Sequence, residues 1–240
     1  CKVVEDMNKL FTFFIVLGIG VLAGINLEIL IAVLVPGLLF FAALIIISIH
    51  PDEDRRLLTH LFLISFALRA IIGFSIYFLN LADFFGGDHY TYDGGGAALA
   101  NYWSGKNIYL SEIKWISQGA HPGYIYFIGS LYYIAGHQPL AGQAVNWVIG
   151  SFTVYLTYLI AKKMFDRNVA VYAAIFAGIM PNFVIWEAQL LKDTIIIFSL
   201  CLCIYSVMNL QERFSFFYGV LLMAALAILF FFRIYIFYIM

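Results

Sequence analysis

The chain has 240 residues, of which 64% are hydrophobic and only 11% are charged, and its net charge is −1. Soluble domains are about 45–50% apolar and about 25% charged. This composition therefore excludes a soluble globular protein and predicts an integral membrane protein. The near-neutral charge also argues against a nucleic-acid partner, which would need a basic surface.

Long apolar runs predict an all-α, polytopic membrane protein with about seven transmembrane helices. In chain order the expected spans are 10–26, 29–49, 57–80, 141–161, 169–187, 191–209 and 214–236. We expect two organisational units. Residues 1–56 hold two transmembrane helices and a cytoplasmic loop, and residues 57–240 hold the larger module with an outer loop at 81–140. Because the chain stops inside an apolar run, we also expect it to be truncated at its C-terminus.

The apolar segment 122–136 is too short to cross a bilayer. Its fifteen residues would cover about 22 Å as a helix, against a hydrocarbon core of about 30 Å. It is also rich in tyrosine, which prefers the membrane interface. We therefore expect a helix that lies on the membrane surface or dips into it.

The distribution of basic residues supports that interpretation. If 122–136 does not cross, the positive-inside rule assigns to the cytoplasm Lys2, Lys9, Arg55, Arg56, Lys162, Lys163, Arg167 and Arg213. The remaining cations near an outer face are Lys106, Lys114, Lys192 and Arg233. The outer loop, the connection 187–193 and the end of the last span would then share one extracytoplasmic face.

The outer loop carries the acids best suited to chemistry, Asp88 and Asp93, with glycines before and after them. A carboxylate in a partly desolvated cavity can act as a general base. Oxygen ligands can also hold a divalent metal, and Asp88, His89 or Asp93 would be its ligands. The alternative is that these acids are solvated or cap helices.

Further candidates for substrate binding are His121, Glu187, Lys192, Asp193 and Arg233. Charges this close to a membrane core usually have a function. We predict that Glu187, Lys192 and Asp193 line an outer cavity opposite Asp88. A guanidinium at Arg233 is a good bidentate clamp for phosphate. The alternatives are a structural histidine, helix capping by the acids, and an arginine that snorkels to the interface.

Arg69 lies about midway through the expected span 57–80. An arginine at that depth must pair with another group or line a polar cavity. We expect a structural ion pair inside the helix bundle.

The order of these features resembles the GT-C glycosyltransferase superfamily over about residues 57–210. It is similar to the protein O-mannosyltransferases and aminoarabinose transferases of family 39. The resemblance is carried by Gly86-Gly87-Asp88-His89-Tyr90-Thr91-Tyr92-Asp93, His121-Pro122-Gly123-Tyr124, Lys162-Lys163 with Arg167, Pro181, and Leu190-Leu191-Lys192-Asp193. The family often has an acidic or basic residue before the proline, so the histidine at 121 is a departure.

The resemblance implies a transfer of sugar from a polyprenyl-phosphate carrier at the outer face of the membrane. Its first-loop acid corresponds to Asp88, with Asp93 as the second acid. The acid at the start of a later span corresponds to Asp193, and His121 would line the same site. Metal use varies across the superfamily, so a divalent ion stays an open cofactor here.

The function that these features favour is an inverting hexosyl- or pentosyltransferase of the inner cell membrane. A hydroxyl or amine acceptor would attack the anomeric carbon, with Asp88 as base and with Lys192 and Arg233 on the donor phosphate. A secondary transporter or lipid flippase is the alternative, and Arg69 is the main feature in its favour. A scaffold without chemistry of its own is a third interpretation.

Overall fold

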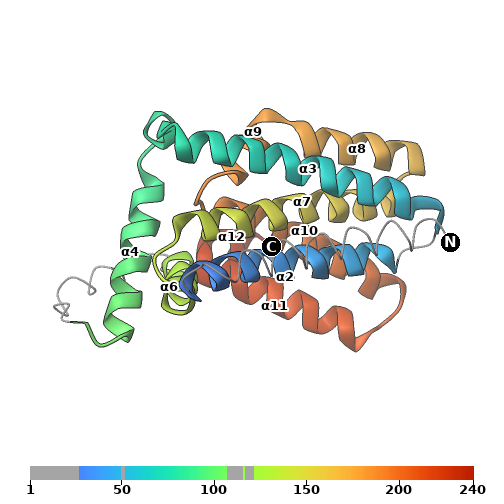
Figure 1. Ribbon diagram of the computed structural model, residues 1–240. Helices are drawn as coiled ribbons and strands as arrows, with labels where there is room; N and C mark the ends of the chain where they lie inside the picture. The colour runs from blue at the N-terminus through green and yellow to red at the C-terminus, as the bar shows by residue number, and fades with distance from the viewer. Residues whose placement is uncertain (1–26, 50–51, 107–115, 117–121) are drawn as a thin grey trace.

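The computed structural model describes residues 27–49, 52–106, 116 and 122–240, and its regular elements are helices (Figure 1). The expected all-α class is confirmed. The long helices run side by side as a bundle, and two further helices lie across one of its ends.

Four helices in the described part of the chain are long and apolar enough to cross a membrane. They are α2 (Leu27–Ser48), α3 (Asp52–Phe78), α7 (Pro139–Met164) and α10 (Asp193–Glu212). These helices confirm the spans expected at 29–49, 57–80, 141–161 and 191–209. The described residues give five such spans at most, so the predicted count of seven is not reached within them. The span expected at 10–26 lies outside the described residues.

The span expected at 169–187 is broken into two helices, α8 (Arg167–Ile179) and α9 (Pro181–Glu187), with a bend of 51° between them. Proline has no N–H group and pushes the preceding residue out of the helical conformation. Met180 accordingly has an extended ψ of 120°. The break therefore lies where the sequence places Pro181, although the run of apolar residues continues through it.

The last apolar run is also divided. Helix α11 (Phe216–Phe232) ends at Arg233, and a short helix α12 (Ile234–Ile239) follows it. Arg233 itself has a non-helical backbone conformation, with φ −155° and ψ 86°. The single span expected at 214–236 is thus two segments, and Arg233 occupies the junction.

Helix α7 is the centre of the bundle. It packs against α2, α3, α8 and α10, and most of its residues are buried. One hydrophobic cluster joins α2, α3, α7 and α8, and includes Phe62, Val154 and Tyr158. A central helix that is covered on most sides can place polar side chains against several neighbours at once.

The helices across the end of the bundle are α4 (Asp88–Trp103) and α6 (Gly123–Ala135). Figure 1 shows α4 running across the direction of the long helices, after the short 3-10 helix η1 (Leu81–Phe85), while α6 is seen almost along its axis. The two helices pack on each other, and α6 also packs on α11, through a cluster that includes Leu99, Ile128 and Leu229. A crosswise α6 agrees with the expectation that 122–136 does not span the membrane.

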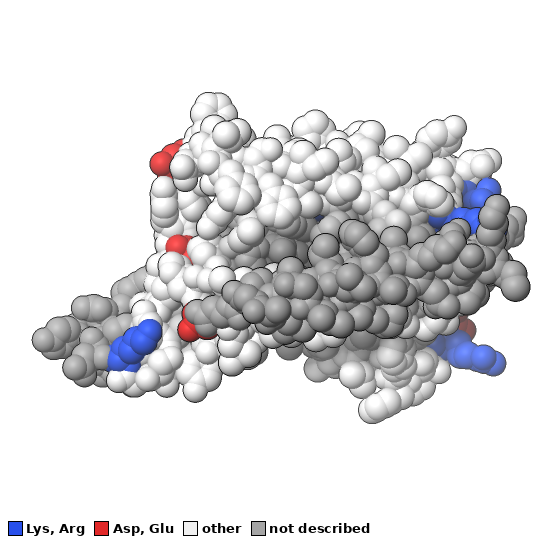
Figure 2. Space-filling model, viewed as in Figure 1, with Lys and Arg blue, Asp and Glu red and all other residues white. Residues whose placement is uncertain are grey.

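The two ends of the bundle carry different charges. The end away from α4 gathers the starts of α3 and α8 and the ends of α7 and α10, and with them Arg55, Arg56, Lys162, Lys163, Arg167 and Arg213. Figure 2 shows most of the visible basic side chains at that end, and most of the visible acidic ones together with one basic group near α4. Asp54 is buried there and pairs with Lys162 and, at 2.7 Å, with Arg167. The described basic residues assigned to one face by the positive-inside rule therefore lie at one end, while Lys2 and Lys9 lie outside the described residues.

Candidate active site

Three chain segments far apart in sequence meet beside Tyr92, on the buried face of α4. They are the start of α4, the start of α10 and the junction between α11 and α12. The Lys192 ammonium lies 5.7 Å from the centroid of the Tyr92 ring. Burial, and then the charges of Asp88 and Asp193, raise the pKa of Tyr92 to about 12, while Arg233 acts in the opposite direction. Tyr92 is therefore surrounded by four of the charged groups that the sequence singles out.

Lys192 immediately precedes α10 and is partly buried. Burial lowers the pKa of its ammonium, and so does the nearby Arg233 cation, while Asp193 and Asp88 favour the charged form. Lys192 and Arg233 are two neighbouring cations, and the nearby carboxylates offset their repulsion only in part. A bound anion would therefore stabilise both cations. Arginine and lysine bind phosphate and carboxylate groups in this way.

Arg233 reaches this cluster because α11 ends there. Its Nη2 lies 3.2 Å from Oδ1 of Asp193, and its guanidinium is 5.6 Å from the ring of Tyr235. Arg233 is partly exposed, as is Asp193. The expectation that Arg233 lies at the outer end of the last span agrees with its position at the end of α11.

Asp88 is the first residue of α4 and is exposed. A carboxylate is stabilised at the N-terminus of a helix, where the backbone N–H groups point outward. Its charge acts on both Tyr92 and Lys192, so it faces the same cluster from α4. Asp88 is thus an accessible acid within reach of the cations.

Asp93 faces in a different direction, toward α6. Its Oδ1 accepts hydrogen bonds from the Tyr132 hydroxyl at 2.7 Å and from His137 Nε2 at 2.9 Å. The side chain is only 26% exposed. The structure therefore gives Asp93 partners that fasten α4 to α6 and to the segment after it, and it separates this acid from the cluster around Tyr92.

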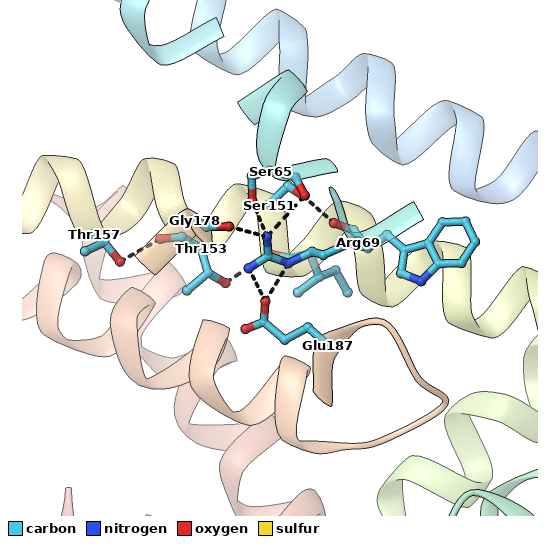
Figure 3. A network of polar contacts seen from close by, with 9 residues as sticks. Ser65, Arg69, Ser151, Thr153, Thr157, Gly178 and Glu187 are labelled. Carbon is cyan, nitrogen blue, oxygen red and sulfur yellow. Dashed lines mark hydrogen bonds and ion pairs between the residues drawn. The ribbon is translucent and has the colours of Figure 1, made fainter. Parts of the chain in front are cut away.

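The predicted position of Glu187 opposite Asp88 is wrong. Glu187 is 2% exposed, and its Oε2 accepts a hydrogen bond from Arg69 Nε at 2.7 Å and lies 2.5 Å from Nη2 (Figure 3). Arg69, 1% exposed, also donates to the hydroxyl of Ser65 and at 3.3 Å to the carbonyl of Gly178. The expected structural pair for Arg69 is confirmed, and its need for a buried anion draws Glu187 into the bundle.

A glycine makes room for this ion pair. A Cβ atom at Gly150, on α7, would lie 2.5 Å from Glu187 Oε2 and 2.8 Å from Arg69 Nε. No side chain fits there without displacing the pair. The pair also borders a cavity of about 330 Å³ lined by Thr153, Thr157 and Phe176 among others.

The remaining predicted ligands are placed as follows. His121 lies outside the described residues. His89 is partly exposed, and its Nδ1 lies 3.1 Å from the carbonyl oxygen of Gly86. Within the described residues, no three His, Cys, Asp or Glu side chains are close enough together to hold a metal ion. A divalent ion at Asp88, His89 or Asp93 stays an untested possibility of the sequence analysis.

The sequence reasoning missed Tyr92, although a signal for it existed. Tyr92 follows Asp88 by four residues, so on a helix the two side chains lie on the same face. It is buried, and its ring packs edge-on against that of Tyr124 at 4.9 Å between centroids. Tyr92 is thus the residue by which α4 forms one side of the site.

An apolar cavity of about 780 Å³ lies among α6, α7, α10 and α11. Its lining consists of Pro122, Gly123, Tyr126, Phe127, Ser130, Ile149, Ile195, Phe198, Ala227, Ile228, Phe231 and Phe232. Phe232 directly precedes Arg233, and Ile195 follows Lys192 by three residues. Tyr126 and Phe231 in the lining are exposed, so the cavity reaches the surface of the bundle. Among the described residues no charged one lines the cavity, but Phe232 in its lining packs against Tyr124 at 6.0 Å between ring centroids, and Tyr124 packs against Tyr92. The apolar cavity and the cationic site therefore lie on either side of shared aromatic residues.

Comparison with known proteins gives one family. The model of the dolichyl-phosphate-mannose-protein mannosyltransferase family matches residues 120–240, just over half of the chain. The matched part runs from α6 to α12 and contains Lys192, Asp193 and Arg233. Searches of curated proteins and of solved structures gave no match. The chain therefore belongs to the dolichyl-phosphate-mannose-protein mannosyltransferase family and is an integral membrane glycosyltransferase of the GT-C kind.

Proposed function

We propose that this protein transfers a hexose or pentose from a polyprenyl-phosphate donor to a hydroxyl or amine acceptor. The observation that carries the proposal is the proximity of the apolar cavity to the Lys192–Arg233 pair, through Phe232, Tyr124 and Tyr92. A polyprenyl phosphate has an apolar chain joined to an anionic head. The apolar cavity would take the chain, and the Lys192–Arg233 pair would bind the head. The family match supports a lipid-linked sugar donor.

In the proposed reaction the acceptor oxygen or nitrogen attacks the anomeric carbon as the bond to the donor phosphate oxygen breaks. Asp88 takes the proton of the acceptor. Lys192 and Arg233 hold the phosphate and stabilise the charge that develops on it. One displacement of this kind inverts the configuration at the anomeric carbon. Asp193 orients Arg233 through their contact at 3.2 Å.

Two of the predicted site residues have no assigned step in this scheme. His121 lies outside the described residues, so its place in the site stays a prediction. Asp93 is the second acid of the prediction, and its contacts with Tyr132 and His137 support a role in holding α4 rather than in the displacement. We assign no step to a metal ion, because the described residues offer no group of three ligands.

The proposed location is the inner cell membrane, with the site facing away from the cytoplasm. The support is electrostatic. The end of the bundle opposite α4 gathers the basic residues of α3, α7, α8 and α10, and cytoplasmic ends of membrane helices carry the excess of lysine and arginine. The α4 end, with its acids and the donor groove, would then be extracytoplasmic.

The direct test replaces Asp88 with asparagine and measures sugar transfer from a polyprenyl-phosphate sugar in vesicles. General-base catalysis contributes about 10²- to 10⁴-fold, so the rate should fall by that order while donor binding persists. Asp83→Asn is the matched control, because Asp83 is another exposed acid at the same end of the bundle. Activity of Asp88→Asn close to that of the control would remove the catalytic assignment.

A transporter or flippase is the competing function, and the broken span α8–α9 favours it. Broken helices with buried charges near them are common in secondary transporters, and Glu187 at the end of α9 is such a charge. Exchange of labelled solute or lipid across proteoliposomes without sugar transfer would support that function instead.

A further inference from the structure

The connection between α9 and α10 is buried although it is not a regular helix. Ala188, Gln189, Leu190 and Leu191 are each 3% exposed or less. A backbone in such surroundings must find hydrogen-bond partners within the protein, because unpaired buried N–H and C=O groups are costly. The partners of this segment therefore determine where its end, Lys192, emerges.

Helix α7 supplies these partners through two consecutive side chains. The Asn146 side-chain nitrogen donates to the carbonyl oxygens of Gln189 at 2.8 Å and of Leu191 at 2.9 Å. The Trp147 ring nitrogen donates to the carbonyl oxygen of Ala188 at 2.9 Å. Three of the four carbonyls between Ala188 and Leu191 are thus bound by α7.

Asn146 also connects this segment to the wall of the site. Its nitrogen lies 3.0 Å from the hydroxyl of Tyr124, whose ring packs edge-on against Tyr92. Asn146 is 0% exposed, so water does not compete for its contacts. Both sides of the anion site, Lys192 on one and Tyr92 on the other, therefore depend on one amide group.

We infer that Asn146 is a positioning residue for the anion site, and that Trp147 assists it. By binding the carbonyls on either side of Leu190, Asn146 fixes the direction in which the chain leaves the bundle, and so places Lys192 and Asp193 against Arg233 and Tyr92. The catalytic consequence rests on the proposed function, whereas the placement of Lys192 does not. The donor N–H groups are essential, because a carboxylate in the same position would face carbonyl oxygens without a proton to share.

The test compares three variants of the full chain in vesicles. Asn146→Leu keeps the size of the side chain and removes both donors. Trp147→Phe removes one donor and retains an aromatic ring, so it tests the same idea in a milder form. Gln143→Leu is the matched control, because Gln143 is a buried amide about one turn earlier on α7. Its oxygen, like that of Asn146, has no hydrogen-bond partner among the described residues.

If Asn146 positions the site, Asn146→Leu should lower kcat/KM for the polyprenyl-phosphate sugar by about 100-fold, as expected for a displacement of about 1 Å. Trp147→Phe should show a smaller loss, and Gln143→Leu should transfer sugar like the original protein. Equal activity of Asn146→Leu and Gln143→Leu would overturn the inference and leave the proposed function intact.

A second measurement works even if no sugar is transferred. Hydrogen exchange of the backbone amides of 189–193 should accelerate in Asn146→Leu and in Trp147→Phe but not in Gln143→Leu. Acetylation of Lys192 by a water-soluble reagent, measured against the exposed Lys106 as internal reference, should rise in the same two variants. Unchanged exchange and unchanged Lys192 reactivity in both would overturn the positioning role, whatever the outcome of the transfer assay.

Discussion

The surroundings of Lys192 make its ammonium group easier to deprotonate. Its pKa is lowered by burial and by Arg233, against the opposing effects of Asp193 and Asp88. An ammonium loses its charge as the pH rises through its pKa, so Lys192 becomes neutral at a lower pH than an ordinary lysine. Its attraction for a donor phosphate is full below that pKa and disappears above it.

This predicts that donor binding weakens from neutral to alkaline pH before ordinary lysines titrate. Arginine stays charged throughout that range, so Lys192→Arg should move the decline to higher pH. The dissociation constant of a polyprenyl phosphate, measured against pH for both proteins, checks the prediction. Identical profiles would mean that the charge of Lys192 does not hold the phosphate.

Asp88 and Asp93 differ in what surrounds them, and this predicts different effects on stability. Asp93→Asn weakens charge-assisted hydrogen bonds to Tyr132 and His137, each worth about 1.5–3 kcal/mol. Asp88→Asn removes an exposed carboxylate and should change the free energy of unfolding little. Thermal unfolding of both variants in detergent separates them, and a larger loss for Asp88→Asn would contradict the assignment.

The sequence predicted which charged residues lie close together at this end better than it predicted their contacts. Lys192, Asp193 and Arg233 are recognisable because charges beside apolar runs are costly and therefore informative. Glu187 was misplaced for the same reason, since its proximity to Lys192 in sequence suggested a shared cavity. The deciding contact comes from Arg69, 118 residues away along the chain. No local pattern reveals which acid an arginine in another helix will select.

At the level of helices, the Arg69–Glu187 pair joins α3 to the end of α9, just where the broken span returns toward α10. A buried ion pair costs desolvation, and removal of one partner leaves the other charge unpaired. The pair therefore holds the α8–α9 segment in a bent arrangement against α3 and α7.

Arg69→Met should accordingly destabilise the fold by about 3–5 kcal/mol, because Glu187 would stay buried without a counterion. The double variant Arg69→Met with Glu187→Leu should recover most of that loss, since it leaves no buried charge. Thermal unfolding in detergent measures both. A double variant as unstable as the single one would show that the ion pair is not what the segment requires.

The apolar runs of the sequence predicted where the helices lie. They did not predict where two of the runs are broken. The runs for α2, α3, α7 and α10 gave ends within a few residues of those observed. The breaks at Pro181 and at Arg233 fall inside runs whose hydrophobicity does not change. The proline is a local signal, whereas the junction at Arg233 coincides with its contact to Asp193 on another helix.

At the level of the whole molecule, the two ends of the bundle should face opposite sides of the membrane. The basic end and the end crossed by α4 are separated by the full length of helices such as α7. The distribution of lysine and arginine among the segments between the apolar runs predicted this arrangement. The crosswise packing of α4 on α6 did not follow from the sequence, because it depends on contacts between segments with no shared periodicity.

Thiol labelling can establish the orientation. Ser104→Cys places a thiol at the exposed end of α4, and Arg213→Cys places one at the opposite end, after α10. In intact cells an impermeant reagent should modify the first and reach the second only after permeabilisation. The unaltered protein gives the background from its own cysteines. The reverse pattern would place the donor groove on the cytoplasmic side.

The apolar cavity reaches the surface of the bundle between α6 and α11, where Tyr126 and Phe231 are exposed. A lipid-borne substrate can thus enter sideways, by two-dimensional diffusion within its own leaflet, without passing through water. Saturation would then follow the mole fraction of that substrate among the surrounding lipids. Diluting vesicles in buffer should leave the turnover rate unchanged, whereas diluting the substrate with inert phospholipid should lower it.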